Sequence, residues 1–89
     1  MNIQQWYKTG DWFDHEGHRI FYRVEGEGQP LLLIHGYPTA SWDWNKVWQP
    51  LAQQFQCIAL DMLGFGYSDK PQQPYRIFQQ ADILCALID

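Results

Sequence analysis

A run of four aliphatic residues, Leu31 to Ile34, ends at a glycine and a proline in the sequence His35-Gly36-Tyr37-Pro38. A short apolar run without alternation, bounded by turn formers, is typical of a strand buried on both faces of a parallel sheet. In open α/β sheets, ligands bind beyond the carboxyl ends of such strands. We therefore predict that residues 35–38 form one corner of a binding or active site.

The segment before this strand has the pattern of a β-hairpin, with strands at 12–15 and 18–25 and a glycine-containing turn at 16–17. The second strand alternates, so we expect a buried face of Ile20, Tyr22 and Val24 and a wetter face of Arg19, Phe21 and Arg23. Residues 1–10 have no periodicity, which leaves Trp6 and Tyr7 either packed on the sheet or part of a frayed arm.

The segment after residues 35–38 predicts a crossover between two parallel strands. The first of these strands, at 31–34, follows an expected loop at residues 26–30, and the second is expected at 57–60. Pro50 favours two short helical turns, one at about 44–48 and one beginning at the proline. The apolar positions expected to face the core are Trp44, Val47, Trp48, Leu51 and Phe55.

A second loop, residues 61–71, is expected at the same sheet edge, and a helix follows it. The positions predicted to form one face of this helix are Ile77, Ala81, Leu84, Cys85 and Ile88. The fold class is therefore α/β: an antiparallel hairpin plus two parallel strands with flanking helices, an incomplete sheet. Few elements remain to flank the strand at 31–34, so its edge is a predicted association site.

Composition excludes several functions for this chain of 89 residues with a net charge of −4. Lysine and arginine are scattered, which argues against a nucleic-acid partner. No apolar stretch reaches the ~18 residues of a membrane span, and the first residues lack a signal-peptide pattern. Cys57 and Cys85 are too few for a disulfide framework, and no set of residues has metal-ligand spacing. We expect a cytoplasmic chain without cofactor or metal.

Three features in this order resemble the start of an α/β-hydrolase: the hairpin, the strand ending in an HGxP motif at residues 35–38, and the loop at 61–71. The HGxP motif and that loop resemble the epoxide-hydrolase and haloalkane-dehalogenase branch. The run from His35 to Trp44 and the loop sequence Asp-Met-Leu-Gly-Phe-Gly-Tyr-Ser-Asp-Lys-Pro are most similar to mesoderm-specific-transcript-like hydrolases.

The resemblance implies the strand order 1-2-4-3-5, in which the strand at 31–34 is strand 3 and strand 5 is missing. Residues 1–89 would then be the N-terminal segment of one hydrolase domain, with strands 1–4 and the first two helical segments. The cap, the C-terminal half, the nucleophile, the acid and the catalytic histidine would lie downstream. No catalytic residue is therefore expected in this chain.

The resemblance also assigns roles to the corner after strand 3. The N–H of Tyr37 would be one oxyanion-hole donor, Gly36 would allow close backbone approach, and Pro38 would follow a cis peptide bond. His35 is expected to hydrogen-bond the loop from beneath rather than act as a base. An aspartate nucleophile of this family stands in a strand-turn-helix elbow with small residues two positions before and after it. Asp61 has Ala59 before it but Leu63 after it, so it is expected to brace the loops instead.

Three further positions bear on substrate and chemistry. Trp42 either lines the pocket or packs, and Ser68 is rejected as a nucleophile because it is misplaced for GxSxG. Leu63 stands where many family members have arginine. Dehalogenases of this branch often have asparagine where Tyr37 stands, which favours ester or epoxide hydrolysis of a small molecule. The alternatives are a non-catalytic truncated binding module, which would dock through the strand 3 edge, and a hydrolase-fold ligand receptor.

Overall fold

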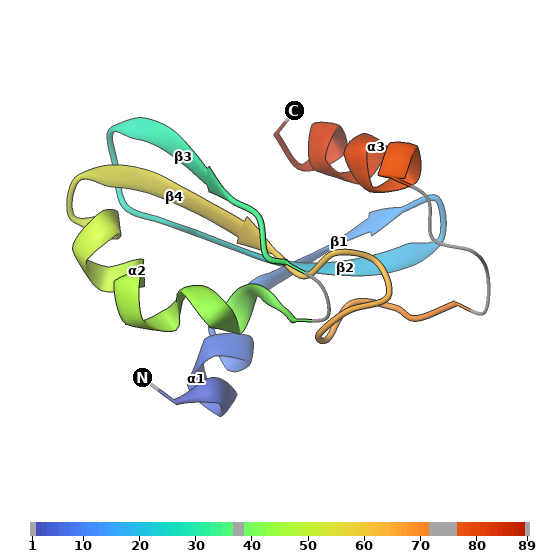
Figure 1. Cartoon of the computed structure of the whole chain (residues 1–89), viewed down its shortest axis with the longest axis horizontal. Coiled ribbons are helices and arrows are strands. Elements are labelled where there is room, and N and C mark those ends of the chain that lie inside the picture. The colour runs from blue at the N-terminus through green and yellow to red at the C-terminus, as the bar shows by residue number, and fades with distance from the viewer. Residues whose placement is uncertain (1, 37–38, 72–76, 89) are drawn as a thin grey trace.

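The computed structural model describes residues 2–36, 39–71 and 77–88 and shows a four-stranded sheet of order β1-β2-β4-β3 (Figure 1). The strands are β1 (Asp11–His15), β2 (His18–Glu25), β3 (Gln29–Leu33) and β4 (Phe55–Leu60). The helices are α1 (Ile3–Lys8), the 3-10 helix η1 (Ser41–Trp44), α2 (Asn45–Ala52) and α3 (Ile77–Ile88). β1 and β4 each pair antiparallel with β2, and β3 pairs parallel with β4.

The sheet confirms the expected hairpin, the two parallel strands and the inverted order of β3 and β4. β4 lies between β2 and β3, so among the described residues β3 is an edge strand with a partner on one side only. β3 begins at Gln29, inside the predicted loop, because Gln29 pairs with Phe55 and an edge strand tolerates Pro30. The strand ends one residue before the apolar run does, because Ile34 lies beyond β3.

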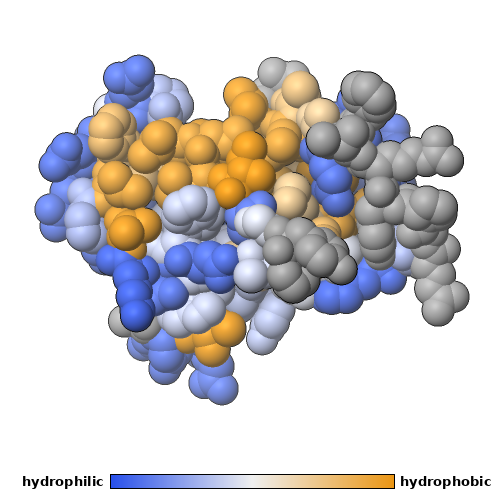
Figure 2. Space-filling model, viewed as in Figure 1, coloured by the Kyte–Doolittle hydropathy of each residue, from blue (hydrophilic) through white to orange (hydrophobic). Residues whose placement is uncertain are grey.

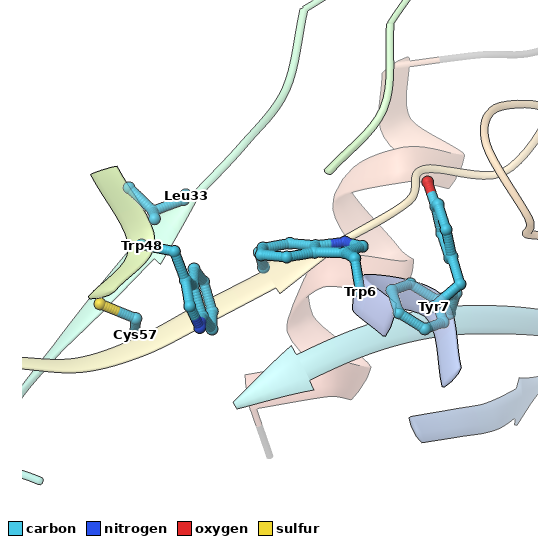
Figure 3. Close-up of a cluster of buried hydrophobic side chains, with 7 residues drawn as sticks. Trp6, Tyr7, Leu33, Trp48 and Cys57 are labelled. Carbon is cyan, nitrogen blue, oxygen red and sulfur yellow. The ribbon is translucent and has the colours of Figure 1, made fainter. Parts of the chain in front are cut away.

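The helices divide between the two faces of the sheet, as Figure 1 shows, with α1 and α2 on one face and α3 on the other. The first face carries a core of Trp6, Tyr7, Phe21, Leu33, Trp48, Cys57 and Ala59. Figure 3 shows Trp6 lying between Trp48 and Tyr7 in this core. The second face carries a core of Ile20, Leu60, Leu63 and Ile83. This two-sided cover is what a parallel strand pair requires.

The predicted faces of β2 were right at Ile20, which is buried, and at Arg19, which is exposed, but wrong at three other positions. Phe21 and Arg23 are buried, whereas Val24 is 46% exposed. Phe21 belongs to the core under α1, and Arg23 donates a hydrogen bond to the carbonyl of Trp6. Alternation predicts one dry face only when a single layer covers the strand. Here α1 covers the face that the alternation assigned to solvent.

The predicted break at Pro50 was also wrong, because α2 runs through it from Asn45 to Ala52. The helix loses the bond that an N–H at Pro50 would donate. Trp48 is buried and Leu51 packs against the same core, so the helix is held on both sides of the proline. Of the predicted core positions, Val47 is 43% exposed and Phe55 begins β4.

Among the described side chains, the predicted face of α3 was right only at Leu84, which packs against the second core. Ile83 is fully buried, and Leu84 and Leu87 pack beside it. Ala81, Cys85 and Ile88 are exposed, and the side chain of Ile77 lies outside the described residues. The C-terminal helix is apolar around most of its circumference, so periodicity alone did not select the stripe that meets the sheet.

An apolar surface remains open over β3 and β4 and reaches α3 (Figure 2). Val24 and Ile88 are exposed and line a cavity here, and Ile34, just beyond β3, is exposed as well. A cavity of about 310 Å³ in this surface is lined by Phe13, Tyr22, Val24, Gln56, Ile58, Ala86, Leu87 and Ile88. The sheet therefore exposes apolar area beside its edge strand, as the sequence predicted.

Candidate functional site

The carboxylate of Asp61 joins the two loops that follow the parallel strands. Its Oδ1 accepts the N–H of Ser41 at 2.7 Å, and its Oδ2 accepts the N–H of Tyr67 at 2.9 Å. Its own N–H donates to the carbonyl of Phe21 at 2.9 Å. Asp61 is fully buried, so these bonds take the place of water around the carboxylate.

The glycines of the second loop make room for this carboxylate. Gly66 has a φ of +55°, and a Cβ on Gly66 would overlap the carboxylate of Asp61. Gly64 has a φ of +90°, a conformation that glycine adopts without the usual strain. The Gly-Phe-Gly sequence is thus required by the turn and by the close approach of Asp61.

Ser68 is buried, and its hydroxyl is occupied on both sides. It donates to the carbonyl of Asp61 at 2.5 Å and accepts the N–H of Phe21 at 2.9 Å. This hydroxyl ties the loop to β2 and has no free path to a ligand.

His35 links the loop after β3 to the loop after β4. Its Nε2 accepts the N–H of Met62 at 2.9 Å, so Nδ1 carries the ring proton and donates to the carbonyl of Gly36 at 2.8 Å. Thr39 also donates to that carbonyl, through its N–H at 3.1 Å and its hydroxyl at 2.9 Å. His35 is 3% exposed, and both ring nitrogens are used.

Among the described residues, leaving out the chain neighbours of Gly36, no atom lies within 4 Å of a Cβ placed on Gly36. Packing against the part of the chain that the structure describes therefore does not require glycine at position 36. Tyr37 and Pro38, the predicted oxyanion donor and the residue after the predicted cis bond, lie outside the described residues.

Trp42 both packs and lines a groove. Its ring meets that of Trp6 edge-on at a centroid distance of 5.8 Å. It also borders a cavity of about 370 Å³ at the carboxyl edge of the sheet. That cavity is lined by Ile3, Tyr7, Thr39, Ala40, Trp42, Asp43, Gly66 and Tyr67.

Leu63 ties the second loop to α3. Its side chain is fully buried in the second core. Gln80 receives the N–H of Leu63 at 3.1 Å and donates to its carbonyl at 2.9 Å. A leucine at this position therefore acts through packing and its backbone.

Tyr7 and Trp6 reach the site from α1, and sequence reasoning gave them no role there. Trp6 donates its Nε1–H to the hydroxyl of Ser41 at 3.0 Å, and the ring of Tyr7 stacks on that of Tyr67 at a centroid distance of 3.7 Å. Burial and the nearby negative charge of Asp61 raise the pKa of Tyr7 well above its usual value. A helix of six residues shows no periodicity; the only signal was the pair of aromatics in an otherwise polar segment.

No group of three or more His, Cys, Asp or Glu side chains within the described ranges lies close enough to hold a metal ion. None of the described helices is long and apolar enough to cross a membrane.

The sheet order, the crossover and the two linked loops define an α/β protein with a candidate site at the carboxyl edge of its parallel strands. A family model described as the alpha/beta hydrolase fold matches residues 29–89. The chain therefore belongs to the α/β-hydrolase fold family.

Curated relatives confirm the resemblance seen in the sequence. The chain is 46% identical over 92 residues to the mesoderm-specific transcript homolog protein of Homo sapiens, covering 97% of this chain and 28% of that protein. It is 40% identical over 79 residues to haloalkane dehalogenase 2 of Mycobacterium bovis, covering 88% of this chain and 28% of that enzyme.

A solved structure agrees in fold. The epoxide hydrolase CorEH without ligand superposes with a TM-score of 0.83 at 35% identity, covering 90% of this chain and 28% of that one. The chain thus spans little more than a quarter of the length of these relatives.

Proposed function

We propose that this chain is the N-terminal part of a hydrolase that acts on a small-molecule ester or epoxide, and that the corner after β3 supplies one oxyanion donor. One observation carries the proposal. Two hydrogen bonds, Met62 to His35 and Ser41 to Asp61, hold the residues on either side of that corner against the neighbouring loop, and no described atom apart from its chain neighbours would crowd a Cβ on Gly36. A rigid corner beside open space is what a preorganised anion-binding backbone needs.

The direction of the Gly36 carbonyl supports the role assigned to the next amide. This carbonyl faces His35 and Thr39, from which it accepts three hydrogen bonds. In a trans peptide unit the N–H points opposite to the C=O. The proposal therefore expects the N–H of Tyr37 to point away from His35, toward the open side. One such donor is worth about 2.7–4 kcal/mol in the transition state.

The remaining machinery is proposed to come from a segment that this chain does not contain. Ser68 is committed to Asp61 and Phe21, and both nitrogens of His35 are used. In this family, nucleophile, acid and histidine follow in that chain order. A cytoplasmic location remains a prediction.

The substrate class rests on relatives and on one side chain. The relatives named as a haloalkane dehalogenase and an epoxide hydrolase support hydrolysis of a small molecule as the reaction. Tyr37 has no amide side chain to hold a leaving halide, and this favours an epoxide or an ester.

The first experiment assays the purified 89-residue chain against styrene oxide and p-nitrophenyl acetate. The expected result is no turnover above buffer, because a single oxyanion donor without a nucleophile leaves almost no catalysis. Turnover well above buffer would overturn the assignment of the nucleophile to another segment.

The second experiment joins residues 1–89 to the remainder of CorEH in place of its own matching segment. An active chimera is expected to lose about 10²–10³ in kcat on Tyr37→Pro, which removes the N–H. Tyr37→Ala, which keeps the N–H, is the matched control and should lose far less. Equal losses in two folded variants would show that the amide of Tyr37 is not the donor.

A second candidate function is a non-catalytic binding module, favoured by the exposed edge of β3 and the apolar surface at Val24 and Ile34. Size-exclusion chromatography separates the two. A discrete complex of defined mass would favour the module, whereas ill-defined aggregation would favour a segment that needs the rest of its domain.

A further inference from the structure

We propose that Gln80 of α3 is a positioning residue for the corner at residues 35–38, on which it acts through the first residues of the loop after β4. Its catalytic consequence rests on the proposed function, because that corner is where the oxyanion donor is placed. The link itself consists of hydrogen bonds among described residues, and it is tested without turnover.

Gln80 lies on the face of α3 that meets the sheet. Residues three, four and seven positions after it, Ile83, Leu84 and Leu87, share one side of the helix with it. Ile83 is fully buried, and the two leucines pack beside it. An amide on such a face needs hydrogen bonds in place of water. Gln80 has them, because its Oε1 accepts the N–H of Leu63 at 3.1 Å and its Nε2 donates to the carbonyl of Leu63 at 2.9 Å.

The two bonds to Leu63 fix the direction of its backbone, which packing alone does not. The side chain of Leu63 is buried in the same core as Ile83, so this contact sets the distance between the loop and α3. The carboxamide of Gln80 bonds to the N–H on one side of Leu63 and to the carbonyl on the other. It therefore sets the rotation of both peptide groups that flank Leu63.

The first three residues of this loop, 61–63, donate their N–H groups to three different elements. In chain order the acceptors are the carbonyl of Phe21 in β2 at 2.9 Å, Nε2 of His35 at 2.9 Å and Oε1 of Gln80 at 3.1 Å. Because peptide units are planar, only the two backbone dihedrals of Met62 separate the second of these N–H groups from the third. Releasing the Leu63 N–H from Gln80 therefore also loosens the Met62 N–H on His35.

One further hydrogen bond lies within the loop, from the N–H of Phe65 to the carbonyl of Met62 at 2.9 Å. Since both partners belong to the loop, this bond fixes the shape of the turn but not its placement against α3. The bonds to Gln80 supply that placement.

His35 carries the position of the loop to the corner. Its Nε2 is occupied by the Met62 N–H, so the ring proton is on Nδ1, which donates to the carbonyl of Gly36 at 2.8 Å. That carbonyl belongs to the peptide unit that carries the N–H of Tyr37, the proposed oxyanion donor. Gln80 is thus connected to the donor's own peptide unit by hydrogen bonds through the loop and the imidazole.

The experiment compares the full 89-residue chain with Gln80→Met, which keeps the length of the side chain, by NMR. Exchange at the Leu63 amide should rise because its acceptor is removed, and a purely local role would produce the same result. A positioning role also predicts that exchange at the Met62 amide rises about three- to tenfold relative to the Asp61 amide, which bonds to Phe21. The ring-nitrogen shifts of His35 should change from the Nδ1–H form to a mixture of tautomers.

Two further variants complete the set. Gln4→Met makes the same change at an exposed glutamine of α1, and it should leave the exchange ratio and the His35 tautomer unchanged. Gln80→Glu keeps an acceptor for the Leu63 N–H but loses the donor to the Leu63 carbonyl, so its effect should have the same direction and be smaller.

A rise confined to the Leu63 amide would overturn the positioning role, as would a uniform rise at the amides of residues 61–63 or no change in both Gln80 variants. In an active chimera with CorEH, Gln80→Met should lower kcat about three- to tenfold at a nearly unchanged KM, because the donor acts in the transition state. An unchanged kcat would also overturn the role. An inactive chimera with a raised exchange ratio at Met62 would instead overturn the proposed function and leave this link standing.

Discussion

Oδ1 of Asp61 lies 2.7 Å from the backbone nitrogen of Ser41, which is twenty residues away in the sequence. This hydrogen bond links the loop after β3 to the loop after β4. Asp61 is the first residue beyond β4 and is fully buried. A buried carboxylate is tolerated only when donors replace its water. The aspartate and the backbone around it are therefore mutually dependent, and the corner after β3 takes its position from this bond.

Asp61→Asn is expected to destabilise the chain by about 2–3 kcal/mol. The amide keeps one acceptor oxygen but turns an NH₂ group toward a second buried donor, the N–H of Ser41 or of Tyr67. Urea unfolding followed by tryptophan fluorescence measures the loss. Asp43→Asn, an exposed neighbour in η1, is the control and should change stability by less than about 0.5 kcal/mol. Equal effects of the two changes would contradict the bracing role.

Arg23→Lys is expected to cost about 1.5–3 kcal/mol and to loosen α1. The guanidinium bonds to Trp6, Thr9 and Glu25 and lies 4.6 Å from the ring centroid of Trp6. An ammonium group cannot reproduce this planar arrangement.

Amide exchange within residues 3–8, together with urea unfolding, tests the Arg23 prediction. Arg19→Lys is the matched control, because Arg19 is exposed and stacks on Trp12 at the surface. Unchanged exchange in α1 of the Arg23 variant would show that the helix is held by packing alone.

Glu25 is expected to make the chain less stable as the pH falls. The hydrogen bond from Trp48 first, and then the bond and charge of Arg23, hold the pKa of Glu25 below its usual value, although partial burial opposes them. A carboxyl with a lowered pKa stabilises the fold above its ordinary pKa of 4.5, and this contribution is lost as the pH falls through the folded value.

The urea midpoint measured between pH 7 and pH 3 tests this dependence on Glu25. Glu25→Gln should flatten the curve in the acid range, and Trp48→Phe, which removes the strongest of the causes, should flatten it in part. An identical slope in Glu25→Gln and the parent would contradict the assignment.

Gly26→Ala is expected to be more damaging than Gly17→Ala, although both glycines have a positive φ, +92° and +87°. Either substitution incurs the left-handed strain of about 1–2 kcal/mol. At Gly26 the new Cβ would also overlap the carbonyl oxygens of Ala52 and Phe55, whereas at Gly17 it meets nothing within 4 Å. The extra cost at Gly26 is expected to be about 1–3 kcal/mol. Thermal unfolding of the pair measures the difference, and equal losses would mean that the backbone at 52–55 moves freely.

The sequence predicted the strands, the hairpin and the loops because these features are local. Gly17 fits a turn by its own backbone preference, and the runs ending at Leu33 and Leu60 are apolar enough to be buried in any arrangement. The HGxP and Gly-Phe-Gly patterns likewise need only their own residues to be recognised, and the family followed from them.

The tertiary structure decided which face of each element is covered. Phe21 and Arg23 are buried because α1, made from a segment without periodicity, folds over them, and Ile83 meets the sheet although α3 also carries apolar residues, Ala81 and Ile88, on its exposed side. The bond from Ser41 to Asp61 and the contacts of Tyr7 join residues twenty to sixty positions apart. A local pattern fixes the propensity of a segment, but burial and buried hydrogen bonds depend on which distant segment arrives, and only the folded chain decides that.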